Sequence, residues 1–305
     1  MATAFSENLT AEQQSQVLQL FQQFQHPTLQ KDLIELKTLK KVEKGGDVLR
    51  IELQLPFAWN TGVEQVKQQL SDALLKATDS KEIKWVVNYQ IATLKRANNQ
   101  PAVKGVKNII AVTSGKGGVG KSSVSVNLAL ALQAQGARVG ILDADIYGPS
   151  VPHMLGAPHQ RPTSPDNQHI TPIKAHGLSA NSIGFLMDED NATIWRGPMA
   201  SSALSQLLNE TLWDSLDYLV IDMPPGTGDI QLTLSQQIPV TGAVVVTTPQ
   251  DIALLDAVKG VSMFERVSVP VLGIVENMSM HICSNCGHHE AIFGTGGAEK
   301  MAQKY

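Results

Sequence analysis

The chain has 305 residues, of which 43% are hydrophobic and 17% charged, and its formal net charge is −4. This composition is typical of a folded globular protein, and the length predicts two domains. The sequence contains no basic block, no apolar signal segment and no apolar run near the ~20 residues that cross a bilayer, so we expect a cytoplasmic protein that binds neither nucleic acid nor membrane.

Residues 1–94 are predicted to form a small α/β domain. A capping box that begins at Thr10 predicts a helix, which ends before Pro27. The alternating apolar residues of Val48–Pro56 predict a half-buried strand, and the same alternation recurs in residues 83–91. With a second amphipathic helix between these strands, the expected order is helix, strand, strand, helix, strand.

Residues 95–106 are polar and are predicted to be a linker. In residues 107–305, short and almost continuously apolar strands alternate with helices, which is typical of strands buried on both faces of a parallel sheet. We therefore predict a doubly wound, mainly parallel α/β domain that binds its ligand at the carboxyl ends of the strands. The expected strands are Asn108–Thr113, Arg138–Leu142, Tyr218–Asp222, Gly242–Thr247 and Val271–Glu276.

A phosphate-binding loop follows the first of these strands. The segment Gly115–Ser122 has the pattern G-x-x-x-x-G-K-S, and a helix is expected directly after it. Glycines let successive N–H groups surround phosphate oxygens, Lys121 supplies a cation, and the Ser122 hydroxyl can hold Mg²⁺. The residues expected to bind ATP here are Gly115, Lys116, Gly117, Gly118, Val119, Gly120, Lys121, Ser122 and Ser123.

The second lysine of this loop, Lys116, gives it a more specific character. The sequence GKGGVGKS resembles the deviant phosphate loop of the MinD-like NTPases. That resemblance implies that Lys116 reaches the nucleotide bound by a second copy of the chain. A lysine exposed on the loop, with no such role, is the alternative.

Acidic residues end two of the predicted strands. Asp222 closes an apolar strand beside the phosphate loop, where a carboxylate would hold Mg²⁺. Asp143 and Asp145 end another strand two residues apart. By resemblance to the same NTPases, Asp145 positions the attacking water and Asp143 supports the metal, whereas strand-end caps are the simpler interpretation. By the same resemblance, Asn277, after the last strand, hydrogen-bonds the adenine.

The two cysteines of the chain, Cys283 and Cys286, form a C-x-x-C pair. A redox pair, a zinc site completed by histidines among His281, His288 and His289, and an iron–sulfur cluster all remain open from the residues alone. A four-thiolate cluster requires a symmetric dimer, because one chain supplies two thiols.

A longer set of motifs favours the cluster. The phosphate loop, DADIYGPSVPHMLG, WRGPM (residues 195–199), LVIDMPPGTGD and ENMS with the cysteine pair occur in that order. Together they resemble the Mrp/ApbC family of iron–sulfur cluster carrier ATPases. The resemblance implies a homodimeric ATP hydrolase that uses Lys116, Lys121 and Asp145 for catalysis. It also implies a [4Fe–4S] cluster on Cys283 and Cys286, Mg²⁺ on Ser122 and Asp222, and apo iron–sulfur proteins as recipients.

Two further expectations concern the ends of the chain. Residues 1–94 resemble the small iron–sulfur-assembly domain often fused to these carriers, although His26 stands where that domain has aspartate. Relatives continue beyond a helix expected at Gly297–Lys304, so the ATPase domain is expected to be short at its C-terminus. Two other functions compete: a MinD-type positioning ATPase, for which no amphipathic targeting helix is visible, and an ATP- and zinc-binding scaffold.

Overall fold

The computed structural model describes residues 3–97, 100–187 and 197–305, and these residues form two compact units. The first unit comprises Met1–Ala92 with Ala134–Ala137, and the second comprises Thr93–Gln133 with Arg138–Tyr305. Trp195 and Arg196 of the WRGPM motif lie outside the described residues. None of the helices in the described part of the chain has the length and apolar character that a bilayer crossing needs.

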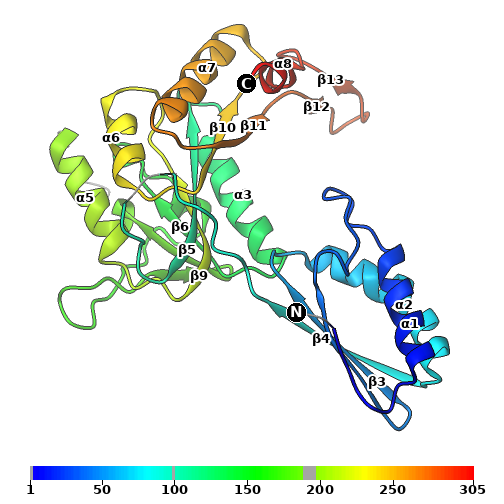
Figure 1. The fold of residues 1–305 in the computed structure, drawn as a ribbon. Coiled ribbons are helices and arrows are strands. Elements are labelled where there is room, and N and C mark those ends of the chain that lie inside the picture. Colours follow the sequence, from blue (N-terminus) through cyan, green and yellow to red (C-terminus); the bar gives the residue numbers. More distant parts are fainter. Residues whose placement is uncertain (1–2, 98–99, 188–196) are drawn as a thin grey trace. The chain divides into compact units, whose positions relative to one another are not determined.

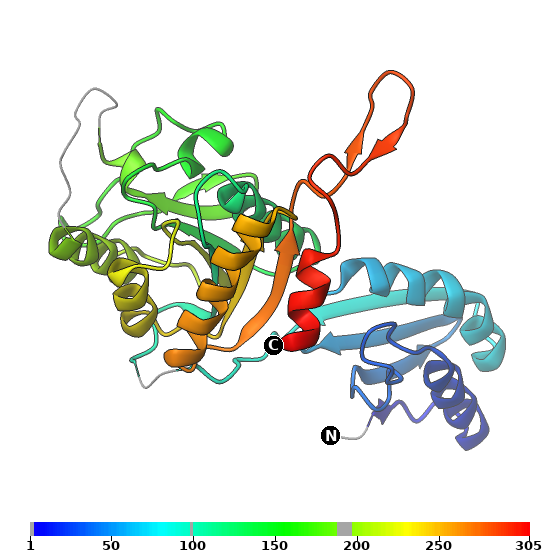
Figure 2. The same cartoon turned by 90° about the horizontal axis from the view of Figure 1, so that it is seen from above.

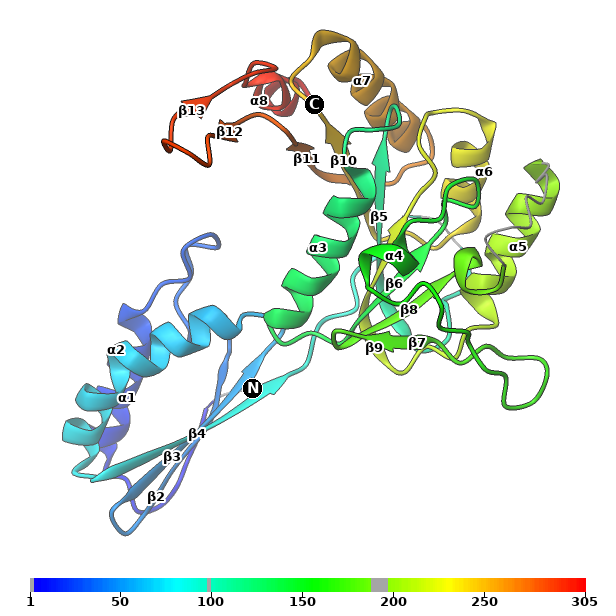
Figure 3. The ribbon, with the colours of Figure 1, turned by 180° about the vertical axis from the view of Figure 1, so that it is seen from behind.

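The first unit is a four-stranded sheet with two helices (Figures 1 and 3). The elements are β1 (Ala4–Phe5), α1 (Ala11–Gln23), β2 (Leu39–Gly45), β3 (Val48–Leu55), α2 (Asn60–Thr78) and β4 (Glu82–Tyr89). The strand order is β1-β2-β3-β4, with β2 and β3 antiparallel and the other pairs parallel. The predicted element order is confirmed, apart from the two-residue strand β1, which was not expected.

The capping box that predicted α1 is present in the structure. The Thr10 side chain accepts a hydrogen bond from the Gln13 N–H, and the Gln13 side chain accepts one from the Thr10 N–H. Val17 and Phe21 then face the core of this unit, where they pack with apolar residues of α2 and the sheet such as Ile51 and Leu74. The apolar alternation predicted for β3 is also observed, because Leu49, Ile51, Leu53 and Leu55 are all buried.

The second unit contains a seven-stranded sheet of order β11-β10-β5-β9-β6-β8-β7. Its strands are β5 (Val106–Ser114), β6 (Val139–Asp143), β7 (Ile173–Ala175), β8 (Leu178–Ser182), β9 (Leu216–Asp222), β10 (Gly242–Thr247) and β11 (Val271–Glu276). Neighbouring strands are parallel except β7 and β8. The predicted doubly wound, mainly parallel sheet is therefore confirmed. All five predicted strands are present, whereas β7 and β8 were not expected.

Helices lie on both faces of this sheet. They are α3 (Lys121–Ala134), α4 (Val151–Met154), α5 (Gly197–Asn209), α6 (Asp229–Gln237), α7 (Asp251–Arg266) and α8 (Gly297–Lys304), with a short 3₁₀ turn at Ile183–Phe185. Figures 1 and 3 show α3 on one face and α5 and α6 on the other. Leu204 of α5 and Leu234 of α6 pack with Ile221 of β9 in the largest core of the unit.

A hairpin made of β12 (His281–Ile282) and β13 (His289–Glu290) stands apart from the large sheet. Figure 2 shows it projecting beyond the end of β11, before the chain returns to α8. The sheet and α3 therefore place the phosphate loop at the carboxyl edge of β5, and β11 carries the cysteine hairpin away from that same edge.

Candidate nucleotide site and cysteine hairpin

The phosphate loop connects β5 to the first turn of α3, as its sequence predicted. Gly118 and Gly120 have φ angles of +81° and +87°, a conformation that glycine adopts without strain. The Ser114 hydroxyl donates to the Lys116 carbonyl at 2.8 Å and so holds the start of the loop. The loop borders a pocket of about 210 Å³, lined by Ser114, Gly117, Gly118, Gly120, Lys121, Ser122, Ser123, Asp145, Met154 and Pro225.

Lys121 is the central charged group of this pocket. Its side chain is only 6% exposed, and its Nζ lies 2.7 Å from Asp222 Oδ1, 3.7 Å from Asp145 Oδ2 and 3.1 Å from the Ser122 hydroxyl. The Ser125 hydroxyl, one helical turn further along α3, also donates to Asp222 Oδ1 at 2.7 Å. The structure thus brings together Lys121, Ser122, Asp145 and Asp222, all of which were predicted from the sequence.

The oxygen atoms around Lys121 are suited to a hard cation. Asp222 is fully buried, and its Oδ2 has no hydrogen-bond partner among the described residues. Ser122 Oγ lies near the same ammonium group. A hydroxyl and a carboxylate beside a phosphate-binding loop are the oxygen ligands that Mg²⁺ takes in nucleotide sites. These residues therefore fit a magnesium-bound nucleotide.

Asp143 organises the loop that carries Asp145. Its carboxylate accepts hydrogen bonds from the N–H groups of Asp145, Ser150 and Val151 and from the Ser182 hydroxyl, each at 3.1 Å. Burial, with the nearby Asp222, raises the pKa of Asp143 to about 7, although the hydrogen bonds to its carboxylate act in the opposite direction. Of its two interpretations, the structure therefore supports the strand-end cap.

Asp145 lies at the edge of the pocket. Its side chain is 13% exposed. Burial raises its pKa above the usual range, and the neighbouring Lys121 opposes this shift. Its Oδ2 lies 3.7 Å from Lys121 Nζ, which is longer than a strong ion pair, so this carboxylate at the pocket edge can still accept a hydrogen bond from water.

Asn277 also comes to the phosphate loop. Its Nδ2 donates to the Val119 carbonyl at 2.9 Å, and its own N–H donates to the Thr247 carbonyl at 2.8 Å. Lys116, in contrast, is not among the described residues that line the pocket. Ser125 is a partner of Asp222 that the sequence analysis missed, and its spacing of four residues from Lys121 on a helix could have revealed it.

The cysteines occupy the tip of the β12–β13 hairpin, which is closed by a turn. The Cys283 N–H donates to the His288 carbonyl at 2.9 Å, and the Gly287 N–H donates to the Cys283 carbonyl at 2.8 Å. The backbone N–H groups of Cys286 and Asn285 lower the pKa of the Cys283 thiol. Cys286 is exposed and Cys283 is half-buried, and both are free thiols. The turn therefore favours the thiolate form of Cys283, next to the exposed Cys286.

The surroundings of the thiols bear on the zinc alternative. In the described part of the chain, no three His, Cys, Asp or Glu side chains come close enough to hold one metal ion. His281, His288 and His289 all belong to that part, so they do not complete a four-ligand site with the cysteines within one chain.

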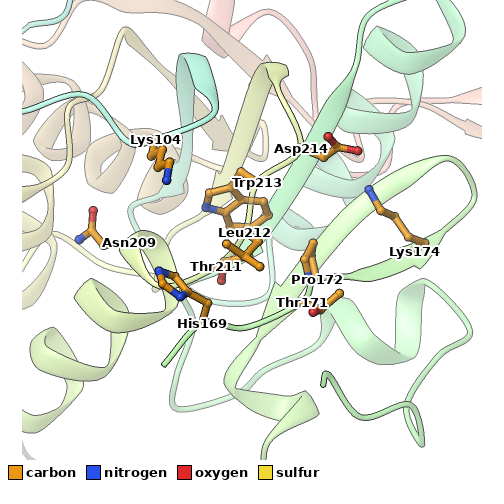
Figure 4. Close-up of a pocket in the computed structure, with 10 residues that line it drawn as sticks. All are labelled: Lys104, His169, Thr171, Pro172, Lys174, Asn209, Thr211, Leu212, Trp213 and Asp214. Atoms are coloured by element: carbon orange, nitrogen blue, oxygen red, sulfur yellow. The ribbon is translucent and has the colours of Figure 1, made fainter. Parts of the chain in front are cut away.

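A second pocket, of about 370 Å³, lies at the opposite end of the sheet (Figure 4). It is lined by Lys104, which precedes β5, and by Trp213 and Asp214, which precede β9. Lys174 also lines it, but its Nζ donates to Ser179 Oγ at 2.7 Å, and Trp213 Nε1 donates to the Leu208 carbonyl at 2.8 Å. The Lys174 ammonium group and the Trp213 indole N–H therefore already have partners within the protein.

Comparison with known proteins agrees with this geometry. The sequence model of a family described as "ParA: NUBPL iron-transfer P-loop NTPase" matches residues 105–305. A Haemophilus influenzae protein named iron-sulfur cluster carrier protein is 91% identical over 305 residues, which is 100% of this chain and 82% of that protein. An Escherichia coli protein of the same name is 69% identical over 282 residues, covering 92% of this chain and 76% of that protein.

A solved structure is similar as well. A nucleotide-binding protein in complex with ADP from Archaeoglobus fulgidus shares 41% sequence identity and superimposes with a TM-score of 0.59. The match covers 66% of this chain and 79% of that one.

Proposed function

The chain belongs to the NUBPL iron-transfer P-loop NTPase family, and from that premise we propose that it hydrolyses ATP and carries an iron–sulfur cluster to recipient apo-proteins. The observation that carries this proposal is the pair of free thiols, one exposed and one half-buried, on a hairpin of the same unit that holds the phosphate loop. The cluster is cargo. Thiols at the tip of a mostly exposed hairpin suit the acceptance and release of a cluster better than its permanent storage.

The proposed cargo is a [4Fe–4S] cluster shared by two chains. Each chain offers Cys283 and Cys286, and such a cluster takes four thiolates. Two copies related by a two-fold axis supply them, which makes the active protein a homodimer. The absence of a third ligand near these thiols, within the described residues, supports sharing between chains over a mononuclear zinc site.

The nucleotide chemistry is assigned to residues of the phosphate pocket. Lys121 and the loop N–H groups bind the phosphates, Ser122 and Asp222 hold Mg²⁺, and Asp145 positions the water that attacks the γ-phosphorus. When bound, Mg²⁺ would supply positive charge that neutralises the phosphate oxygens of the triphosphate. Lys116 is proposed to reach the nucleotide of the second copy, and Asn277 to contact the adenine. The first 94 residues are proposed to be a domain that docks partners.

Anaerobic reconstitution tests the cargo. We expect about four irons and four sulfides per two chains, a broad visible absorbance and a shift to dimer. Cys283→Ala and Cys286→Ala should each abolish all three effects and keep nucleotide binding, because the phosphate loop belongs to another strand. Ser284, which lies between the two cysteines, provides the control, because Ser284→Ala should load iron normally. One zinc per chain and no iron would refute the carrier function and leave the nucleotide site standing.

Two lysine variants test the nucleotide chemistry. Lys121→Ala removes the buried cation of the pocket and should abolish nucleotide binding, measured by calorimetry. Lys116→Ala should keep binding and reduce hydrolysis, because its proposed target lies on the second copy. Equal loss of binding in both variants would argue against a role across the dimer.

A further inference from the structure

We propose that Asn277 is a positioning residue that links the phosphate loop to the cysteine hairpin, so that nucleotide binding restrains the hairpin. This link rests on the proposed function, because it assigns a means of regulation to the proposed cluster site. The elements involved are the Val119–Gly120 peptide unit, Asn277 with the adjacent Glu276, and the hairpin segment 278–296.

The peptide unit between Val119 and Gly120 lies between Asn277 and the phosphate pocket. The Val119 carbonyl accepts the Asn277 side-chain N–H at 2.9 Å, and Gly120 lines the phosphate pocket. Among the described residues no peptide bond is cis, and in a trans peptide the C=O and N–H point in opposite directions. The bond that directs the Val119 carbonyl toward Asn277 therefore directs the Gly120 N–H away from it, as a phosphate ligand requires.

The two ends of the hairpin segment are held by adjacent residues, Glu276 at the end of β11 and Asn277 directly after it. Asn277 anchors the outgoing chain through its bonds to Val119 and to the Thr247 carbonyl. Glu276 anchors the returning chain, because its carboxylate accepts the N–H of Gly296 at 3.0 Å and the N–H of Ala298 at 2.8 Å. A displacement of the loop peptide thus acts on the base of the whole hairpin.

The backbone next to each anchor has a left-handed φ angle, at which the direction of the chain can change. Met278, directly after Asn277, has φ +59°, and Gly296 has φ +81°. Methionine is strained in this left-handed region, so small rearrangements at Asn277 can release or impose that strain. Between these points the hairpin is mostly exposed, and its two short strands are paired only with each other. Little else therefore holds it in place.

Hydrogen–deuterium exchange on the cluster-free protein tests the link, with segment 278–296 as the reporter. Saturating Mg²⁺–ADP should slow exchange of this segment by about fivefold or more, the lower range of measured couplings between sites. Asn277→Asp has the same shape but offers no N–H to Val119, and it should lose this slowing even when calorimetry shows that the site is saturated. That binding also shows that the variant is folded.

Glu276→Ala is the second test variant, and Glu290→Ala is its matched control. Glu276→Ala frees the returning end of the hairpin and should also reduce the slowing, with nucleotide affinity unchanged. Glu290→Ala removes the same side chain from β13, which no anchor uses, and should behave as the wild type. Slowing that persists in saturated Asn277→Asp, or its absence in the wild type, would overturn the link. Failure of iron loading with intact slowing would instead refute only the cluster cargo.

Discussion

Gly120 shows how closely the phosphate loop and Asn277 meet. A Cβ added at Gly120 would lie 2.2 Å from Asn277 Nδ2, and its φ of +87° is unfavourable for any other residue. At Gly117, in the same loop, a Cβ would meet nothing within 4 Å. Both glycines line the pocket, but only for Gly120 do the φ angle and the contact with Asn277 exclude a side chain.

We predict that Gly120→Ala weakens nucleotide binding by about tenfold or more, because the loop must leave its left-handed conformation or push Asn277 away. Gly117→Ala, at an open position of the loop, should have a much smaller effect. Calorimetric titration with ADP measures both. Similar losses in the two variants would contradict the assignment of Gly120 to the contact with Asn277.

Asp143 makes a pH-dependent contribution to stability. Its pKa is about 7 in the folded chain against an ordinary value of 3.8. Between these values the folded state holds a proton that the unfolded state has released, so the contribution of Asp143 to stability falls as the pH rises through this window and is constant above it. The slope is limited to about 1.4 kcal/mol per pH unit.

Comparison with Asp143→Asn tests this contribution, because the variant keeps the shape of the side chain and removes its titrating carboxyl group together with its repulsion of Asp222. From about pH 5 to about pH 7, the free energy of unfolding of the wild type should fall relative to that of the variant. Urea denaturation, analysed for the unit that contains Asp143, provides the measurement. A difference that does not change with pH would show that Asp143 is ionised throughout.

At the scale of elements, the capping box of α1 is a local device with a measurable effect. Thr10→Ala removes the side-chain acceptor of the Gln13 N–H and should cost about 1 kcal/mol. Amide exchange in residues 11–23 should become about fivefold faster. Ser15→Ala, at an exposed position within the same helix, should not accelerate it, because alanine is the better helix former. No acceleration in Thr10→Ala would mean that the cap adds nothing to helix stability.

Strong local signals explain which elements could be predicted from the sequence. The strands β10 and β11 agree with the predicted Gly242–Thr247 and Val271–Glu276, because they are continuous apolar runs. β8 was missed because it is buried but polar. Its Asn181 donates to Thr211 Oγ1, and its Ser182 donates to Asp143, both partners being distant in the sequence. Periodicity cannot reveal a strand whose burial depends on such hydrogen bonds.

The candidate site was predictable to a similar degree. The phosphate loop, Asp145 and Asp222 follow from motifs at strand ends, and the structure brings them around Lys121. The contact of Asn277 with Val119 joins residues 158 positions apart, and only the sheet order, with β10 between β5 and β11, brings them together. The adenine role of Asn277 and the role of Lys116 across the dimer stay predictions.

At the scale of the whole molecule, the two units have separate apolar cores. A nucleotide that binds the second unit should stabilise that unit alone, by about 2.7 kcal/mol at a hundredfold excess over Kd. In calorimetric unfolding, addition of Mg²⁺–ADP should therefore raise the midpoint temperature of one transition and leave that of the other unchanged. Lys121→Ala should show no shift of either transition on addition of Mg²⁺–ADP. A single transition that rises as a whole would mean that the two units unfold together.

The ion pair of Lys121 implies an exchange of counter-ions during each cycle. In this structure Lys121 neutralises the buried Asp222, whose second oxygen has no partner among the described residues. A triphosphate that draws Lys121 toward itself leaves this carboxylate without a counter-ion, which is costly at a buried position. A divalent metal arriving with the nucleotide can take over the neutralisation. Metal and nucleotide should therefore bind cooperatively, and the metal-free nucleotide should be a poor ligand.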